Sequence, residues 1–262
     1  MKRRDFIIQS TRVGLTLPLL SKFVPSKTHW ITLSFDDGFK KSFYHIAGIH
    51  ENFGLKACLN VIASGHLPGF KAVDQWILPE LMGNFDDWNK LKGRGHEIMP
   101  HTWEHLNLTR IPEKQAKENM TKCFDYFESH LDGYDPAYAV YNFAFNASTT
   151  ELEAFALERV SAVRTSGGLL LKDQLANSIP STNKSLRLGC WSQGPDYCDT
   201  FVEKEINDFL KTDGGWLILN LHGLDQEGWG PIHPEFLEKL LERLVALPHV
   251  AVEPAGVFIR HL

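Results

Sequence analysis

The feature of this sequence that most constrains its fold is a regular alternation of short apolar runs with longer segments of helical periodicity. Apolar runs rich in β-branched and aromatic residues predict strands at residues 30–35, 57–62, 96–99, 138–143, 161–163, 216–221 and 250–252. Apolar positions at helical spacing predict helices at residues 112–130, 149–160, 199–211 and 234–247. This alternation predicts an α/β fold with a mainly parallel sheet, either open or rolled into a barrel.

Composition supports one packed domain of catalytic size. The chain has 262 residues, of which 43% are hydrophobic and 23% charged, as in an ordinary globular protein. Residues 167–195, rich in Gly, Ser, Asn and Pro, predict a long irregular excursion on this domain. Four cysteines with no C-x-x-C pair exclude a disulfide-built scaffold and a zinc ribbon. Cys190 and Cys198 bracket a loop and are a candidate disulfide, although buried free thiols are the interpretation that we favour.

The amino terminus predicts a targeting segment. Residues 1–27 combine Arg3 and Arg4 with an apolar stretch at 13–20, which is typical of a twin-arginine export signal; the alternative is a basic amphipathic first helix. We therefore expect residues 28–262 to form the mature domain, exported to the periplasm or the extracellular space. Pro18 interrupts the apolar stretch, and neither it nor any later segment reaches the roughly 20 residues of a membrane span. If the signal stays uncleaved, it would tether the protein to the membrane.

Charge argues against a nucleic-acid partner. Without residues 1–27 the chain has 21 basic and 31 acidic side chains, a net charge of −10, and no run of lysine and arginine. Binding to a phosphate backbone needs clustered basic residues. A neutral substrate, or one whose charge is met locally, is the better match.

Polar residues follow four of the predicted strands. They are Asp36 and Asp37, the segment 101–105, the segment 142–146, and His222. Loops at the carboxyl ends of parallel strands carry the chemistry of such folds. We therefore expect these four clusters to converge on one face of the domain.

Two of these clusters suggest a metal site. Asp36 and Asp37 leave a buried run and would repel each other unless a cation or a proton intervenes; the alternative is a helix-capping aspartate in a turn before Gly38. His101 and His105 are four residues apart and are predicted to open a helix, on which their imidazoles would share one face and bind one metal. The spacing alone is weak evidence, because 12 histidines make one such pair common by chance. One carboxylate and two imidazoles leave positions open for water and substrate, as a catalytic zinc requires.

His222 ends another apolar strand and precedes Gly223. A histidine in this position is often a hydrogen-bonded structural group. Because imidazole titrates near neutral pH, His222 is also a candidate general acid that protonates a leaving group.

Two motifs together resemble a known family. Residues 33–38 (LSFDDG) and 95–109 (GHEIMPHTWEHLNLT) are similar to the first two signatures of the polysaccharide deacetylases, which are carbohydrate esterase family 4 or the NodB-homology domain, and residues 216–222 resemble the late histidine motif. The resemblance runs from about Thr28 to Phe258. It implies a distorted (β/α) TIM-like barrel and metal-dependent hydrolysis of acetyl groups on sugars.

The same resemblance implies a role for each matching residue. Asp36 corresponds to the general base and His222 to the general acid. Asp37, His101 and His105 correspond to the metal ligands. Zinc is the default for this ligand set, and other divalent metals are compatible with it.

The chain departs from the family pattern at the third and fourth motifs. Residues 141–146 (YNFAFN) lack the arginine and proline of the third motif, and Arg164, at the end of the next strand, is expected to supply the missing charge to the base. The fourth motif, an acid and a tryptophan near the histidine, is at best echoed by Trp191 or Asp196. We expect the substrate to contact Asn142 and Phe143 from the third motif, and the rings of Trp103 and Trp229, for which simple packing is an equal alternative.

These observations predict an exported, metal-dependent deacetylase that removes N- or O-linked acetyl groups from a poly- or oligosaccharide. Two alternatives stay open. One is a catalytically silent carbohydrate-binding member of the family, and the other is a hydrolase of a non-sugar amide.

Overall fold

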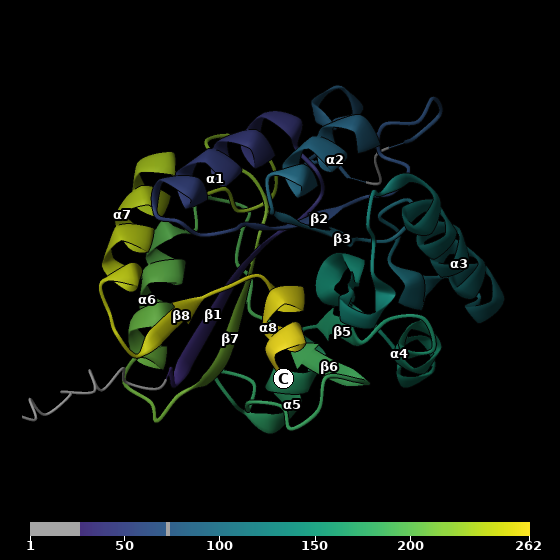
Figure 1. Ribbon diagram of the computed structural model, residues 1–262. Helices are drawn as coiled ribbons and strands as arrows, with labels where there is room; N and C mark the ends of the chain where they lie inside the picture. The colour runs from purple at the N-terminus through teal and green to yellow at the C-terminus, as the bar shows by residue number, and fades with distance from the viewer. Residues whose placement is uncertain (1–26, 72–73) are drawn as a thin grey trace, which may run out of the picture.

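The computed structural model describes residues 27–71 and 74–262 (Figure 1). The strands are β1 (His29–Phe35), β2 (Cys58–Val61), β3 (Glu97–Pro100), β4 (Val140–Asn142), β5 (Ala162–Thr165), β6 (Leu186–Gly189), β7 (Gly215–Leu221) and β8 (Val250–Val252). All of the predicted strands are confirmed, with ends that differ by two residues or fewer. β6 is additional: together with the helix α5 (Gly167–Lys172) it lies in the segment predicted to be irregular, so that prediction is wrong there.

The strands form two parallel sheets. The first has the order β3-β2-β1-β7, with β8 also paired to β1, and the second has the order β4-β5-β6. Polar contacts bridge both seams: the Asn142 side chain donates to the Pro100 carbonyl (3.2 Å), and the backbone of Trp191 bonds to Ile218 and Asn220 in β7. The predicted α/β class is confirmed, as a distorted barrel whose ladders are interrupted between β3 and β4 and between β6 and β7.

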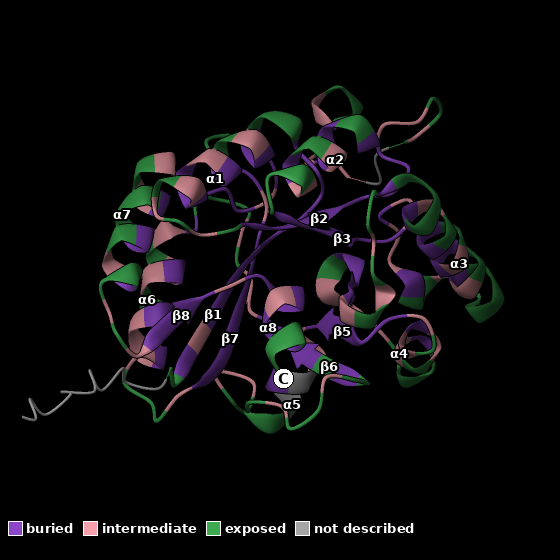
Figure 2. Cartoon of the chain, viewed as in Figure 1, coloured by how far each residue is buried: buried purple, intermediate pink, exposed green. Residues whose placement is uncertain are grey.

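The helices surround these sheets, with α1, α6 and α7 on one side of β1 and β7 and with α3 and α4 near β5 (Figure 1). Their bounds are α1 (Lys40–Asn52), α2 (Phe85–Gly93), α3 (Glu113–His130), α4 (Thr150–Leu157), α6 (Asp199–Phe209), α7 (Pro234–Val245) and α8 (Ala255–His261). The four predicted helices are confirmed as α3, α4, α6 and α7. The buried faces of the helices turn toward the strands in Figure 2, which is the arrangement that amphipathic helices adopt on a sheet.

β1 and β7 form the centre of the fold, and predicted site residues follow directly after the carboxyl end of each strand. Every residue of β7, and every residue of β1 except Trp30, is buried. Such strands read as continuous apolar runs because both of their faces are covered. The exceptions within these runs are polar groups such as Ser34 and Asn220, which lie opposite each other in the ladder. Buried polar groups need partners, so these positions mark the polar interior of the barrel.

The four cysteines are free and buried. The thiol of Cys190 donates to Asn146 Oδ1 (3.2 Å), and that of Cys198 donates to the Gly230 carbonyl (3.0 Å). The candidate disulfide is therefore absent, and each thiol has a polar partner of its own.

The predicted signal segment lies outside the described residues, apart from Lys27, whose Nζ donates to the Val250 carbonyl (2.6 Å). In the described part of the chain, no helix combines the length and the apolar character that crossing a membrane requires.

Candidate active site

The carboxyl ends of the parallel strands gather the predicted clusters around one cavity of about 350 Å³. Asp36 and Asp37 follow β1, His101 follows β3, and His222 follows β7. The residues that line the cavity are Asp36, Asp37, Asp74, Trp76, Ile77, His101, His105, Phe145, Asn146, Ser192, Asn220, His222 and Trp229. The four predicted clusters therefore converge on one cavity, as expected.

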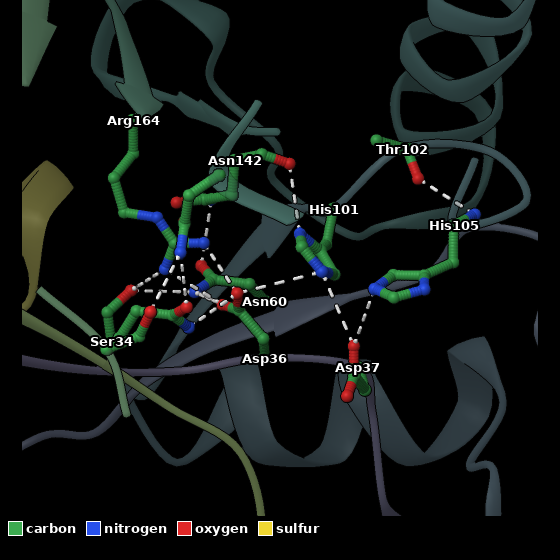
Figure 3. Close-up of polar contacts among 12 residues, drawn as sticks. Ser34, Asp36, Asp37, Asn60, His101, Thr102, His105, Asn142 and Arg164 are labelled. Atoms are coloured by element: carbon green, nitrogen blue, oxygen red, sulfur yellow. Dashed lines mark hydrogen bonds and ion pairs between the residues drawn. The ribbon is translucent and has the colours of Figure 1, made fainter. Parts of the chain in front are cut away.

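The two histidines are brought together by a loop, and the predicted helix at 101–105 is wrong. Thr102 and His105 adopt left-handed backbone conformations (φ 62° and 57°) that a helix does not contain. The Thr102 hydroxyl accepts the backbone N–H of His105 at 2.9 Å (Figure 3), which closes the turn. Asp37 also has a positive φ, of 81°. Strained backbone of this kind clusters at functional sites.

Asp37, His101 and His105 form a set of donors that fits a divalent metal. Asp37 Oδ1 lies 3.4 Å from His101 Nε2 and 3.3 Å from His105 Nε2 (Figure 3). One donor atom from each residue lies within 4.8 Å of the others. Within the described chain, the buried Asp37 Oδ1 accepts no hydrogen bond. An orphaned carboxylate oxygen beside two imidazole nitrogens is the ligand chemistry of zinc.

Hydrogen bonding and burial prepare these donors. His101 Nδ1 lies 3.0 Å from the Asn142 carbonyl, so Nδ1 carries the proton and Nε2 presents a lone pair. Burial lowers the pKa of His105 to about 4, which keeps its imidazole neutral at neutral pH. Burial raises the pKa of Asp37, but His105 and His101 outweigh it and hold that pKa below the ordinary 3.8. Burial lowers the pKa of His101, but the carboxylates of Asp36 and Asp37 outweigh it and raise that pKa above the ordinary 6.5. Asp37 and His105 are therefore in the protonation state that binds a metal, and a metal would replace the proton that these carboxylates favour on His101 Nε2.

Asp36 sits in a cradle of donors next to this cluster. Its Oδ1 accepts from Asn60 Nδ2 (2.7 Å) and Arg164 Nη1 (3.0 Å). Its Oδ2 accepts from Asn220 Nδ2 (2.7 Å) and Arg164 Nη2 (2.5 Å). Burial raises the pKa of Asp36, but the Arg164 guanidinium and, after it, His101 lower that pKa by more than burial raises it. The net pKa of Asp36 therefore lies below 3.8. Asp36 is an oriented carboxylate that is ionised at neutral pH.

Arg164 comes from β5 and points across the barrel to Asp36 (Figure 3). Its side chain is only 1% exposed, and Nη1 also donates to Ser34 Oγ (2.9 Å). Asn142 of β4 and Arg164 of β5 are direct partners in the ladder. The structure therefore places a guanidinium on Asp36 from the strand next to the third motif, where the sequence led us to look for it.

His222 and Trp229 line the same cavity, with their ring centroids 5.7 Å apart and the rings nearly perpendicular. Within the described residues, the buried His222 Nδ1 has no hydrogen-bond partner. Neither candidate for the fourth motif supplies one: Trp191 Nε1 donates to the Leu175 carbonyl (2.6 Å), and Asp196 is exposed.

Comparison with known proteins decides the family. The profile of the polysaccharide deacetylases matches residues 24–158, which is just over half of the chain. This chain belongs to the polysaccharide deacetylase family. A search of curated protein sequences found no match.

Solved structures of deacetylases share the fold at low identity. A candidate polysaccharide deacetylase from Mycobacterium smegmatis has a TM-score of 0.64 at 15% identity, covering 90% of this chain and 91% of the other. The Xyl-CE4 domain of a xylanase from the hindgut metagenome of Trinervitermes trinervoides has a TM-score of 0.54 at 14% identity, covering 90% and 91%. The peptidoglycan deacetylase PdaC from Bacillus subtilis has a TM-score of 0.54 at 14% identity, covering 89% and 92%.

Three of the predicted substrate contacts lie away from the cavity of this deacetylase-family chain. Phe143 is fully buried in the core, and Trp103 packs against Tyr126 with ring centroids 5.4 Å apart. The side chain of Asn142 is turned inward, where its amide donates to Asn60 Oδ1 (3.0 Å) and to backbone carbonyls. None of the three lines the cavity. The structure therefore places these three side chains outside the cavity wall, and Asn142 contacts the site through its carbonyl, which lies 3.0 Å from His101 Nδ1.

Sequence reasoning also missed several residues of the site. Ser34, Asn60 and Asn220 surround Asp36, and their signal was a polar residue inside an otherwise apolar strand. Asp74 arrives from the long connection between β2 and α2, which carries no motif. Phe145 is 50% exposed beside His105 with a left-handed φ of 58°. No pattern in the sequence predicts that conformation for a phenylalanine.

Proposed function

We propose that this chain is a metal-dependent deacetylase that hydrolyses N- or O-linked acetyl groups of a poly- or oligosaccharide. The observation that carries the proposal is the orphaned Asp37 oxygen between two imidazole nitrogens, next to a second, ionised carboxylate in one cavity. A divalent metal, with zinc as the default, would polarise the acetyl carbonyl and lower the pKa of a bound water to about 7.

The residues of the chain then divide the remaining work. Asp37, His101 and His105 would hold the metal. Asp36 accepts the proton of the attacking water, and its fixed position matters because a general base must meet that proton within hydrogen-bond reach. A depressed pKa makes Asp36 a weak base, so the transfer depends on the acidity of the water. His222, also in the cavity wall, donates a proton to the departing nitrogen or oxygen.

Aromatic side chains in the cavity support a sugar substrate. Trp76, Phe145 and Trp229 contribute to its walls, and Phe145 is half exposed. Apolar ring faces pack against the C–H faces of sugars, while Asn146 and Ser192 offer polar groups on the same wall. The structural neighbours described as a Xyl-CE4 domain and a peptidoglycan deacetylase support an acetylated glycan as the substrate class.

Replacing Arg164 with Ala is expected to lower kcat/KM about 10- to 100-fold, because Asp36 loses two of the four hydrogen bonds that orient it. Burial would then raise the pKa of Asp36 without an opposing guanidinium. The acid limb of the pH profile of kcat/KM should therefore move to higher pH. Arg187→Ala is the matched control, since Arg187 lies on the neighbouring β6 and pairs with Glu153 (2.9 Å) at the surface. An Arg164→Ala enzyme with unchanged kcat/KM and an unchanged pH profile would refute the role of Arg164.

We also propose that residues 1–27 direct export by the twin-arginine route, on the strength of their sequence alone. Changing Arg3 and Arg4 together to Lys keeps the charge and removes the paired arginines. The double variant is expected to accumulate in the cytoplasm, as measured by fractionation of the producing cells. Export of the double variant at the wild-type level would rule the signal out.

A further inference from the structure

Asp74 lies beside the candidate metal ligands and belongs to the long connection between β2 and α2. Its Oδ1 accepts the backbone N–H groups of Trp76 (2.9 Å) and Ile77 (3.2 Å), so the carboxylate is fixed by its own turn. Its Oδ2 lies 3.8 Å from His105 Nδ1. The side chain is three-quarters buried in the cavity wall. One oxygen therefore holds the turn, and the other faces a metal ligand.

The two ligand histidines differ in how their second nitrogen is held. A neutral imidazole has one proton, which must sit on Nδ1 if Nε2 is to bind a metal. His101 satisfies this through the Asn142 carbonyl. His105 Nδ1 is buried and has no hydrogen-bond partner in residues 27–71 and 74–262. Asp74 is the acidic side chain that lies within 4 Å of this nitrogen in the same part of the chain.

We propose that Asp74 is a positioning residue for His105, which keeps the proton of that imidazole on Nδ1 and so presents the bare Nε2 to the metal. The inference rests on the proposed metal-dependent function. Carboxylates that orient ligand histidines are a general device of metal sites. Here the same side chain holds the turn that brings Trp76 and Ile77 into the cavity wall. Asp74 therefore contacts both the metal ligand His105 and the turn that forms part of the cavity wall.

The test is Asp74→Asn in the full chain. Asn keeps the Oδ1 acceptor for the turn but places an amide donor toward His105 Nδ1, which favours the tautomer with its proton on Nε2. We expect affinity for Zn²⁺, measured by competition with a chromogenic chelator, to fall about 10- to 100-fold. The thermal midpoint of the metal-free protein should stay unchanged. Asp74→Ala loses the turn acceptor as well and should lower both quantities.

Asp135→Asn is the matched control, because Asp135 also caps a turn, through the Ala137 N–H (3.1 Å), but is exposed and lies outside the cavity. The Co²⁺ absorption spectrum is the second readout, since a weakened or misoriented His105 should change the ligand-field bands in Asp74→Asn and not in Asp135→Asn. Zn²⁺ affinity and Co²⁺ spectrum equal to wild type in Asp74→Asn would overturn the inference and leave Asp74 a turn residue. A wild-type chain that binds neither ion would overturn the proposed function itself and this inference with it.

Discussion

Replacing Asp36 with Asn should lower kcat for acetate release by at least about 100-fold while the chain still binds zinc. The reason is the loss of a proton acceptor beside the candidate metal ligands, because an amide cannot take a proton from water at neutral pH. Asp37, His101 and His105 are unchanged in this variant, so zinc content measured by atomic absorption should match that of wild type. Near-normal turnover would show that Asp36 is not the base.

The same substitution also disturbs a buried ion pair, and the experiment must separate the two effects. Every hydrogen-bond partner of the two Asp36 oxygens is an N–H donor. The amide nitrogen that Asp36→Asn introduces would therefore face another donor in either orientation. The Arg164 guanidinium would also lose its countercharge, which typically costs about 3–5 kcal/mol of stability for a buried pair. The double variant Asp36→Asn with Arg164→Met removes both charges. Its thermal midpoint should recover toward wild type while kcat stays low, which assigns the loss of turnover to the missing base.

Replacing His101 with Ala should abolish both metal binding and activity. His101 supplies one of three donors, and even residues that only orient a ligand are worth about 10- to 100-fold in metal affinity, so losing a ligand should cost more than that. The variant should elute without zinc after gel filtration in metal-free buffer, and its acetate release should fall to background. His105→Ala should behave in the same way.

His66→Ala is the matched control for these variants. His66 is a partly buried histidine of the neighbouring loop that contacts the Tyr126 hydroxyl (3.2 Å) and lies outside the cavity lining. It should retain zinc and turnover. Full zinc occupancy in His101→Ala or His105→Ala would mean that the ligand set is wrong.

Much of the fold followed from the sequence because the central strands are buried on both faces. The continuous apolar runs of β1 and β7 leave little choice of structure. β6 was not predicted because it is only four residues long, exposes Arg187, and lies among turn-forming residues. The helix expected at 101–105 failed for a different reason: the left-handed conformations of Thr102 and His105 depend on tertiary contacts, which spacing does not report.

The chemistry of the site was more predictable than its walls. Arg164 was found from the sequence because neighbouring strands of a parallel sheet end at the same edge, and the ladder indeed pairs it with Asn142. The inward direction of the Asn142 side chain was not predictable, since it depends on the seam between β3 and β4. Asp74 and Phe145 come from loops whose paths are fixed by packing, and no local pattern indicates them.

The measurement that tests the central claim most directly is acetate release by the purified chain from a panel of N- and O-acetylated glycans and a non-sugar acetamide, with and without chelator, followed by restoration with zinc. We expect release from at least one glycan, its loss with chelator and its return with zinc. Acetate from a non-sugar amide alone would keep the reaction and change the substrate class. A chain that binds zinc and releases no acetate from any of these compounds would contradict the account and favour a silent carbohydrate-binding member of the family.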